Sequence, residues 1–409
     1  MRRDVWPAAA LLVAGWALTL RVMPWSDERI NDLGVYRGFA AEMVAGGLPY
    51  RDFFFEYPPL SAPVLWLPGV FGTGYESYRI SFAIAILLLA LVVMLLLAAL
   101  AERTGGERRH ALYAAALMPL LCGAMLRTHF DLAPVAIVLV ALWLLCSGRA
   151  RLGLAALGIG ALVKGFPLVV LPVALAWLVG RGLRREAWQG ALACAAVIGT
   201  LSLAALALSP DGAIDTLRYH QERSVQVEST PAVALLALDA VGLGRAELVS
   251  SHGSEGLDHP VAGVAEGLSA ALVLIAVGLF SAAAARGPDQ GSERRLVLAA
   301  LAAVTAFAAL GKVLSPQFLV WVYPLGALAF AWRMRALTGA VALALALTFV
   351  EFPAHYLDYL SREGTIVLVV VLRDLALLAA LGLALARLQP RRREDLLDRR
   401  RPSVAAGVD

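Results

Sequence analysis

Apolar segments separated by shorter polar ones repeat along almost the whole chain. A helix needs about 17 to 25 apolar residues to cross the hydrocarbon core of a bilayer, and most of these segments approach that length. The pattern therefore predicts about twelve transmembrane helices. They are expected at about residues 6–24, 79–101, 111–126, 132–147, 152–163, 166–180, 187–208, 266–285, 296–311, directly after 317, 336–352 and 365–387. A shorter apolar run at 63–71 is expected to lie in the membrane interface.

The composition supports an all-α polytopic membrane protein. Of the 409 residues, 60% are hydrophobic and 16% are charged, whereas about 25% of residues in soluble domains are charged. The three cysteines all fall within apolar runs, which excludes a disulfide scaffold. The first apolar segment follows Arg2 and Arg3, as a signal peptide would. It is long, however, and lacks a cleavage site of small residues, so we expect a retained helix.

Arginine clusters occur in alternate polar loops. The positive-inside rule places these loops and both termini in the cytoplasm. The opposite side then holds the long loops 25–78 and 209–265 together with both lysines, Lys164 and Lys312. The net charge of +4 is thus explained by membrane orientation and does not indicate a nucleic-acid partner. The Ala-, Arg- and Leu-rich composition indicates a bacterial plasma membrane, with the chemistry on its extracytoplasmic face.

The domain organisation follows from this pattern. Residues 1–388 are expected to form one transmembrane catalytic domain that includes the two outer loops. Residues 389–409 are rich in Arg, Glu and Asp without an apolar period. They are expected to form a disordered, basic cytoplasmic tail that contacts anionic membrane lipids.

The polar, acidic and aromatic stretch 27–60 is the first candidate for chemistry, because membrane residence alone does not require it. Asp32 lies just after the first apolar segment, where a carboxylate would sit close to the membrane surface. We interpret it as a catalytic base; the alternative is the N-cap of the amphipathic helix that follows, and one residue could fill both roles. Asp27 and Glu28 are the nearest competitors for the base.

A transferase on the outer face has few requirements. Nucleotide sugars are not normally available there, so the donor is expected to be a sugar on a polyprenyl phosphate. The lipid phosphate is a good leaving group, so one carboxylate suffices as base, and cations must hold the phosphate. Lys164, Lys312 and Arg127 lie at the predicted outer ends of helices. Lys164 needs a partner there unless it reaches the interface by snorkelling.

The segment 218–229 is dense in hydrogen-bonding groups. His220, Arg223, Gln226 and Glu228 have spacings that could place them on one face of a helix of one or two turns. We predict that Arg223 contacts the phosphate and that the other three contact substrate; a solvated surface loop is the alternative. Further substrate contacts are expected at Tyr36, Tyr57 and Gln317. No His, Cys and carboxylate spacing predicts a metal site.

Several motifs resemble glycosyltransferase family 87. They are Asp32 followed by Tyr36, GGLPYRDF at 46–53, EYPP at 56–59, KGFP at 164–167, YHQER to ES at 219–229, KVLSPQF at 312–318 and WVYP at 321–324. The resemblance implies a GT-C membrane fold and a polyprenol-phosphate-mannose-dependent α-mannosyltransferase. It also implies an inverting transfer without a metal or cofactor, with Asp32 as the base.

We therefore expect a glycosyltransferase that moves mannose from a polyprenyl-phosphate donor to a cell-envelope glycolipid or glycan. A transporter or flippase is the alternative, because many carriers have about twelve spans. Against it, the helices do not divide into two similar halves, and most charges lie in loops. Arg373 and Asp374 lie within a helix, and we interpret them as a structural pair. A polysaccharide polymerase or ligase would differ mainly in transferring an oligosaccharide.

Overall fold

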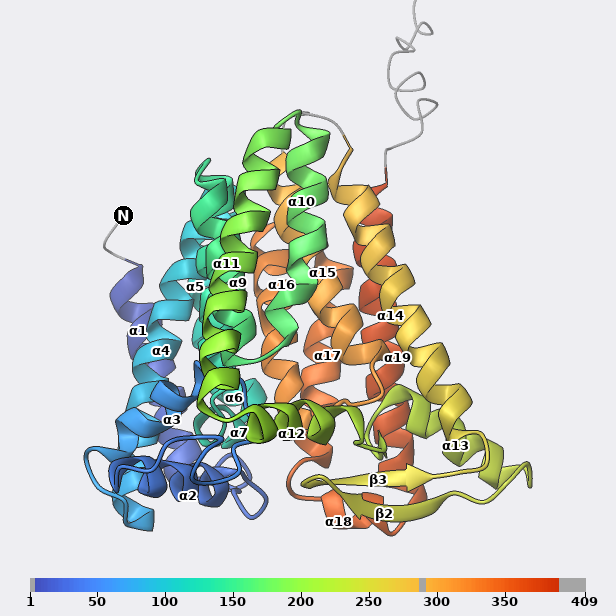
Figure 1. Ribbon diagram of the computed structural model, residues 1–409. Helices are drawn as coiled ribbons and strands as arrows, with labels where there is room; N and C mark the ends of the chain where they lie inside the picture. The colour runs from blue at the N-terminus through green and yellow to red at the C-terminus, as the bar shows by residue number, and fades with distance from the viewer. Residues whose placement is uncertain (1–3, 287–291, 390–409) are drawn as a thin grey trace, which may run out of the picture.

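The computed structural model describes residues 4–286 and 292–389 (Figure 1). The described residues do not include Arg2 and Arg3. They also exclude the predicted tail, except for residue 389. Most of the described chain is helical, and the long helices run side by side (Figure 1). The bundle contains α1 (Val5–Arg21), α4 (Tyr75–Arg103), the shorter α5 (Arg108–Ala116) and α6 (Met118–Cys122), α8 (Leu132–Cys146), α9 (Ala150–Val163), η1 (Phe166–Val169) with α10 (Val170–Gly180), α11 (Arg184–Leu208), α14 (Ala262–Ala284), α15 (Ser292–Leu310), η2 (Pro316–Phe318) with α16 (Leu319–Ala331), α17 (Arg335–Glu351) and α19 (Gly364–Leu388).

The smaller elements gather at one end of this bundle, drawn at the bottom of Figure 1. They are α2 (Leu33–Val44), α3 (Ser61–Gly69), α7 (Met125–Thr128), α12 (Pro210–Gln221), α13 (Thr230–Ala240), α18 (Tyr356–Leu360), β1 (Val225–Gln226), β2 (Glu247–Ser251) and β3 (Ser254–Asp258). The two long segments predicted as outer loops, 25–78 and 209–265, supply most of these elements. Both are therefore folded structures that lie at the same end of the molecule.

The chain is a membrane protein, but the predicted number of spans is not confirmed. In the described ranges, four helices are long and apolar enough to cross a bilayer: α4, α11, α14 and α19. The other apolar helices are shorter, in part because the chain bends within a predicted span. The segment predicted at 111–126, for example, is divided into α5 and α6 and then turns at Gly123, where φ is +56°.

An all-α fold was expected, and in this respect the prediction is wrong. The strands form an antiparallel sheet in the order β1-β3-β2. The hairpin between β2 and β3 turns at His252 and Gly253, which have φ values of +51° and +66°. Positive φ at both central residues is the geometry that matches the twist of two paired strands. The predicted helical face over 220–228 is also wrong, because α12 ends at Gln221 and β1 follows.

Small residues allow the bundle helices to pack closely, as is usual for helices in membranes. A Cβ at Gly180, at the end of α10, would lie 1.9 Å from the backbone oxygen of Ala285. A Cβ at Gly190 in α11 would lie 2.4 Å from the side chain of Leu154 in α9. Both contacts are too short for any side chain, so these glycines set the distance between their helices.

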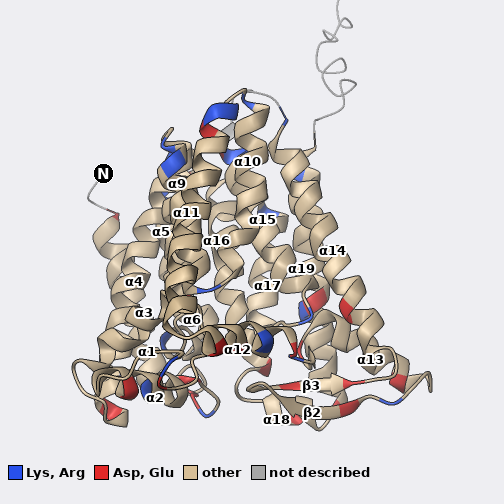
Figure 2. Cartoon of the chain, viewed as in Figure 1, with Lys and Arg blue, Asp and Glu red and all other residues tan. Residues whose placement is uncertain are grey.

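Charged residues gather at the two ends of the bundle (Figure 2). Lys and Arg dominate the end with the turn between α10 and α11, whereas the end with the smaller elements carries both signs. This separation agrees with the two sets of loops that the sequence distinguishes. Which end faces the cytoplasm stays a prediction.

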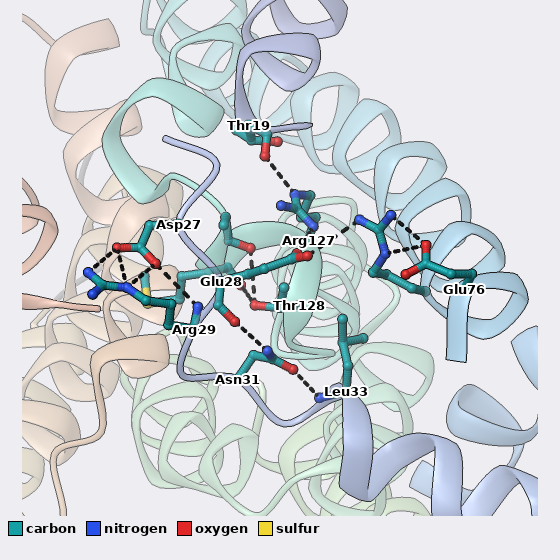
Figure 3. A network of polar contacts seen from close by, with 12 residues as sticks. Thr19, Asp27, Glu28, Arg29, Asn31, Leu33, Glu76, Arg127 and Thr128 are labelled. Carbon is teal, nitrogen blue, oxygen red and sulfur yellow. Dashed lines mark hydrogen bonds and ion pairs between the residues drawn. The ribbon is translucent and has the colours of Figure 1, made fainter. Parts of the chain in front are cut away.

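A buried ion pair fixes the start of the first outer segment to the bundle (Figure 3). The guanidinium of Arg127 is only 2% exposed; it forms an ion pair with Glu28, and its Nε donates to the backbone oxygen of Thr19 at 2.9 Å. On the other side, Arg79 lies 3.4 Å from Glu28 and 2.7 Å from Glu76. Through Glu28 this network joins α1, the first outer segment, α4 and α7.

Glu28→Gln should lower the stability of the fold by roughly 3 kcal/mol, because it leaves the buried Arg127 charge without its carboxylate. Glu76→Gln is the matched control: its side chain is 67% exposed, and such exposed pairs contribute about 1 kcal/mol or less. The check is the thermal unfolding midpoint of the purified protein in detergent. Equal midpoints for the two variants would contradict a structural role for the Arg127–Glu28 pair.

Candidate functional site

A cavity of about 1500 Å³ lies among the smaller elements and the adjoining ends of the bundle helices. Nine of the predicted site residues line it: Asp32, Tyr57, Lys164, His220, Arg223, Gln226, Glu228, Lys312 and Gln317. These residues come from distant parts of the chain. The fold therefore brings most of the predicted candidates to one hollow, although their individual roles stay predictions.

Asp32 occupies the N-cap position of α2, but its side chain does not cap the helix. The neighbouring Asn31 accepts the Leu33 N–H through Oδ1 at 2.9 Å. The Asp32 carboxylate is thus available for other contacts and is 38% exposed. The Tyr36 hydroxyl donates to its Oδ2 at 3.1 Å, and Nε2 of the buried His129 lies 3.5 Å from the same oxygen. Tyr36 lies behind Asp32 and orients it, rather than lining the cavity.

Glu56 is a further carboxyl in the cavity, close enough to Asp32 for the two to interact. Burial raises the pKa of Glu56, and hydrogen bonds from the hydroxyls of Tyr219 and Tyr57 act in the opposite direction. The Glu56 backbone oxygen accepts a hydrogen bond from His220 Nε2 at 2.7 Å. This bond fastens the end of α12 to the first outer segment.

Lys164 has the partner that its position requires. Its Nζ lies 2.6 Å from Oδ1 of Asp131, which is itself buried and also accepts a hydrogen bond from Trp321 Nε1 at 2.6 Å. The ammonium group lies 4.8 Å from the centre of the Phe130 ring and 5.4 Å from that of Trp321, a cation–π arrangement. Lys164 is therefore held rigidly at the wall of the cavity.

The two remaining cations of the cavity differ in their partners. Lys312 pairs with Glu266 at 3.1 Å and donates to the backbone oxygen of Gln221 at 2.9 Å. Arg223 has one weak contact, from its Nε to Ser254 Oγ at 3.4 Å. Within the described ranges no carboxylate forms an ion pair with Arg223. Of the three cations, Arg223 is the one most available to an added anion.

Arg127 does not line this cavity. Its guanidinium is buried against Glu28 and Thr19, on the bundle side of the first outer segment. The predicted contact between Arg127 and a phosphate therefore has no support in the geometry, because the charge is already neutralised and enclosed. We leave Arg127 out of the site.

Several residues of the site are absent from the set that the sequence predicted. Glu56 and Tyr219 belong to motifs already noted, but nothing in their spacing showed that they meet each other and Asp32. His129 and Asp131 flank the turn before α8, and Trp321 begins the WVYP motif. A buried carboxylate beside a predicted span could have pointed to Asp131, since such a charge needs a partner.

One wall of the cavity is apolar. Ala205 and Leu206 of α11 face it, as do Gly267, Ala270 and Leu274 of α14. The part of α11 that could span a bilayer is only 6% buried, and that of α14 is 22% buried, so both helices are largely open to their surroundings. An extended apolar chain could therefore lie against α11 and α14 while its polar end enters the cavity.

No group of three or more His, Cys, Asp or Glu side chains in the described parts of the chain is arranged to hold a metal ion. The polar groups of the cavity instead combine carboxyls, cations, phenols and imidazoles. This set can bind an anion and sugar hydroxyls, and it can accept a proton at Asp32.

Comparison with known proteins identifies the family to which this chain is similar. The model of glycosyltransferase family 87 matches residues 54–316. No curated protein sequence matches the chain. Two solved structures of the Archaeoglobus fulgidus oligosaccharyltransferase are similar at 15% identity. One is tethered to an acceptor peptide with the NVT sequon (TM-score 0.42, covering 98% of this chain and 58% of that one); the other is the apo form (TM-score 0.43, 97% and 58%). The chain thus spans less than two thirds of those proteins.

Glu56→Gln should make the stability of the fold less dependent on pH. Because the pKa of Glu56 is raised in the folded state, the wild type loses stability as the pH rises above the ordinary value of 4.5 through the raised one. A glutamine does not titrate. As the pH rises from about 4.5 to neutral, the unfolding midpoint of wild type should therefore fall relative to that of Glu56→Gln.

Asp52→Asn serves as the control for this measurement. Asp52 lies in the same outer segment, and its pairing with Arg51 lowers its pKa to about 2. It is thus ionised throughout that pH range, and its variant should differ from wild type by a constant amount. A constant difference for Glu56→Gln as well would overturn the argument.

Proposed function

This chain belongs to glycosyltransferase family 87, which makes it a glycosyltransferase, and we propose that it transfers mannose from polyprenyl phosphate. The acceptor is a hydroxyl of a cell-envelope glycolipid or glycan on the extracytoplasmic face of the membrane. One observation carries the proposal: the Asp32 carboxylate opens into the same cavity as Arg223, Lys164 and Lys312. A base and anion-binding groups are thereby available to one bound substrate pair.

The reaction is a single displacement. The acceptor oxygen attacks the anomeric carbon and forms the new glycosidic bond, while the bond from that carbon to the phosphate oxygen breaks. Asp32 takes the proton of the acceptor hydroxyl, and polyprenyl phosphate leaves with the electron pair. The leaving group is already a phosphate, so no general acid is needed, and we propose that cationic side chains alone stabilise it. His129 and Tyr36 hold the Asp32 carboxylate in place.

The three cations of the cavity differ in how available they are to a bound phosphate, and we assign them different roles on that basis. Arg223 forms no ion pair among the described residues, although Glu56 is near enough for the two charges to interact, so we assign it the main contact with the donor phosphate. A guanidinium group can donate two parallel hydrogen bonds to the oxygens of one phosphate, and it keeps its charge at any physiological pH. Lys164 and Lys312 already have carboxylate partners, so we assign them a secondary contact with the phosphate at the edge of the site. His220, Tyr57 and Gln317 line the cavity and are assigned to the sugar.

The polyprenyl chain has a place in this arrangement. We assign it to the apolar wall formed by α11 and α14, which leads from the surface of the bundle to the polar groups of the cavity. A lipid could then bind without leaving the bilayer. The alternative of a transporter or flippase does not account for membership of a glycosyltransferase family, and we set it aside.

Asp32→Asn should reduce the rate of sugar transfer by about 100-fold or more, because the base is lost while the shape of the site is kept. Donor binding should remain. The measurement is turnover by purified enzyme with polyprenyl-phosphate mannose, together with donor affinity. Asp52→Asn, a carboxylate of the same outer segment paired with Arg51 at the surface, is the control and should turn over normally. Unchanged turnover in Asp32→Asn would rule out Asp32 as the base.

Arg223→Ala should raise the KM for the donor by about 10-fold to 100-fold, which is the worth of a hydrogen bond to a charged group. The matched control is Arg218→Ala, which removes an arginine five positions earlier whose side chain is 65% exposed. Steady-state kinetics at varied donor concentration distinguish the two. If both variants keep the wild-type donor KM, Arg223 does not hold the phosphate.

A further inference from the structure

The turn formed by residues 226–229 is tied to the protein through its backbone. The Gln226 N–H donates to the backbone oxygen of Lys312 at 2.9 Å. The Ser229 hydroxyl donates back to the Gln226 oxygen at 2.6 Å, which closes the turn. The buried Tyr359 hydroxyl donates to the oxygen of Val227 at 2.7 Å. The position of this turn at the cavity is therefore fixed before any ligand binds.

A buried charged group stands behind the turn. The guanidinium of Arg373 in α19 is fully buried; it donates to the backbone oxygen of Glu228 and lies 2.9 Å from Asp374 and 3.9 Å from Glu351. The Glu228 carboxyl interacts with Glu351 as well. Arg373 and Asp374 do pair, as the sequence analysis interprets them, but the pair is part of a larger group that reaches the cavity through Glu228. Such buried charges are costly and commonly mark function.

The side chains of the turn leave hydrogen-bonding capacity unused. The amide nitrogen of Gln226 donates to Oε2 of Glu228 at 3.3 Å. Oε1 of Gln226 has no hydrogen-bond partner in the described structure, although the residue is only 4% exposed and lines the cavity. The Glu228 carboxyl, 1% exposed, also lines the cavity and shares a hydrogen bond with Glu351 behind it. Buried polar atoms are rarely left without partners. The free Gln226 oxygen can accept a hydrogen bond from a ligand, and the Glu228 carboxyl beside it offers a second polar contact.

The electrostatics of the turn indicate the kind of ligand. Three carboxyls face one guanidinium here, which disfavours an anionic phosphate. Burial, together with the nearby Glu351, raises the pKa of Glu228 well above its ordinary value. Carboxyl and amide oxygens accept hydrogen bonds from hydroxyl groups, so the turn fits a neutral ligand that carries hydroxyls.

We propose that Gln226 and Glu228 form the acceptor subsite, where they bind hydroxyls of a neutral, polyhydroxylated headgroup such as a sugar. The proposal rests on the glycosyl transfer proposed above and separates the two substrates within one cavity. The donor phosphate takes the cationic part around Arg223, and the acceptor takes the turn at 226–229. Arg373, Asp374 and Glu351 hold that turn from behind and do not touch substrate.

The test uses the full-length enzyme, polyprenyl-phosphate mannose and n-octyl α-D-mannopyranoside as the acceptor probe. Gln226→Ala and Glu228→Gln should each raise the KM for the octyl mannoside by about tenfold or more and change the donor KM by less than about twofold. Glu247→Gln is the matched control, because this carboxylate of the same outer segment is 64% exposed on β2. An unchanged acceptor KM, or an equal rise in both KM values, would overturn the subsite.

A second measurement does not depend on turnover. The octyl mannoside should raise the unfolding midpoint of wild type and of Asp32→Asn in a saturable way, and should fail to do so for Gln226→Ala and Glu228→Gln. If wild type does not turn over polyprenyl-phosphate mannose but shows this pattern, the proposed donor is wrong and the subsite stands. A shift that persists in both turn variants, or is absent from wild type, overturns the subsite.

Discussion

The pairing of buried charge is the constraint on which the polar end of this molecule depends. Arg127, Lys164 and Arg373 are each enclosed near or within the apolar bundle, where an unpaired charge is costly. Each has a carboxylate partner, and two of these partners come from a different segment of the chain. The Arg127–Glu28 pair therefore does more than neutralise charge, because it attaches the first outer segment to the bundle, and Arg373 holds the second outer segment through its hydrogen bond to the Glu228 backbone oxygen.

The same pairing separates structural cations from those that can act on a ligand. Arg127 is enclosed and plays no part in the cavity, whereas Lys164 is held at its wall by Asp131 and three aromatic rings. Arg223 comes from the short segment between α12 and β1 and is left with a single weak contact. A site built in this way holds Lys164 in a fixed position and leaves one guanidinium able to bind an incoming phosphate.

The contacts of Asp32 depend both on the neighbouring sequence and on the tertiary structure. Its place at the start of an amphipathic helix left the N-cap role open as the alternative to the role of base. In the structure Asn31 forms the local hydrogen bond to Leu33, and the carboxylate of Asp32 turns toward His129 and Tyr36. This outcome depends on α7 and α8, which bring His129 close to it from about a hundred residues away.

Apolar length and arginine spacing were enough to predict a helical membrane protein, and the motifs were enough to predict the family that the comparison confirms. These properties are local, because hydrophobicity and short motifs are read within one segment. The sheet in 225–258, the enclosure of Arg127, and the contact between Glu56 and Tyr219 were not predicted. They depend on contacts between segments far apart in the chain, and only the tertiary structure decides which buried charge finds which partner.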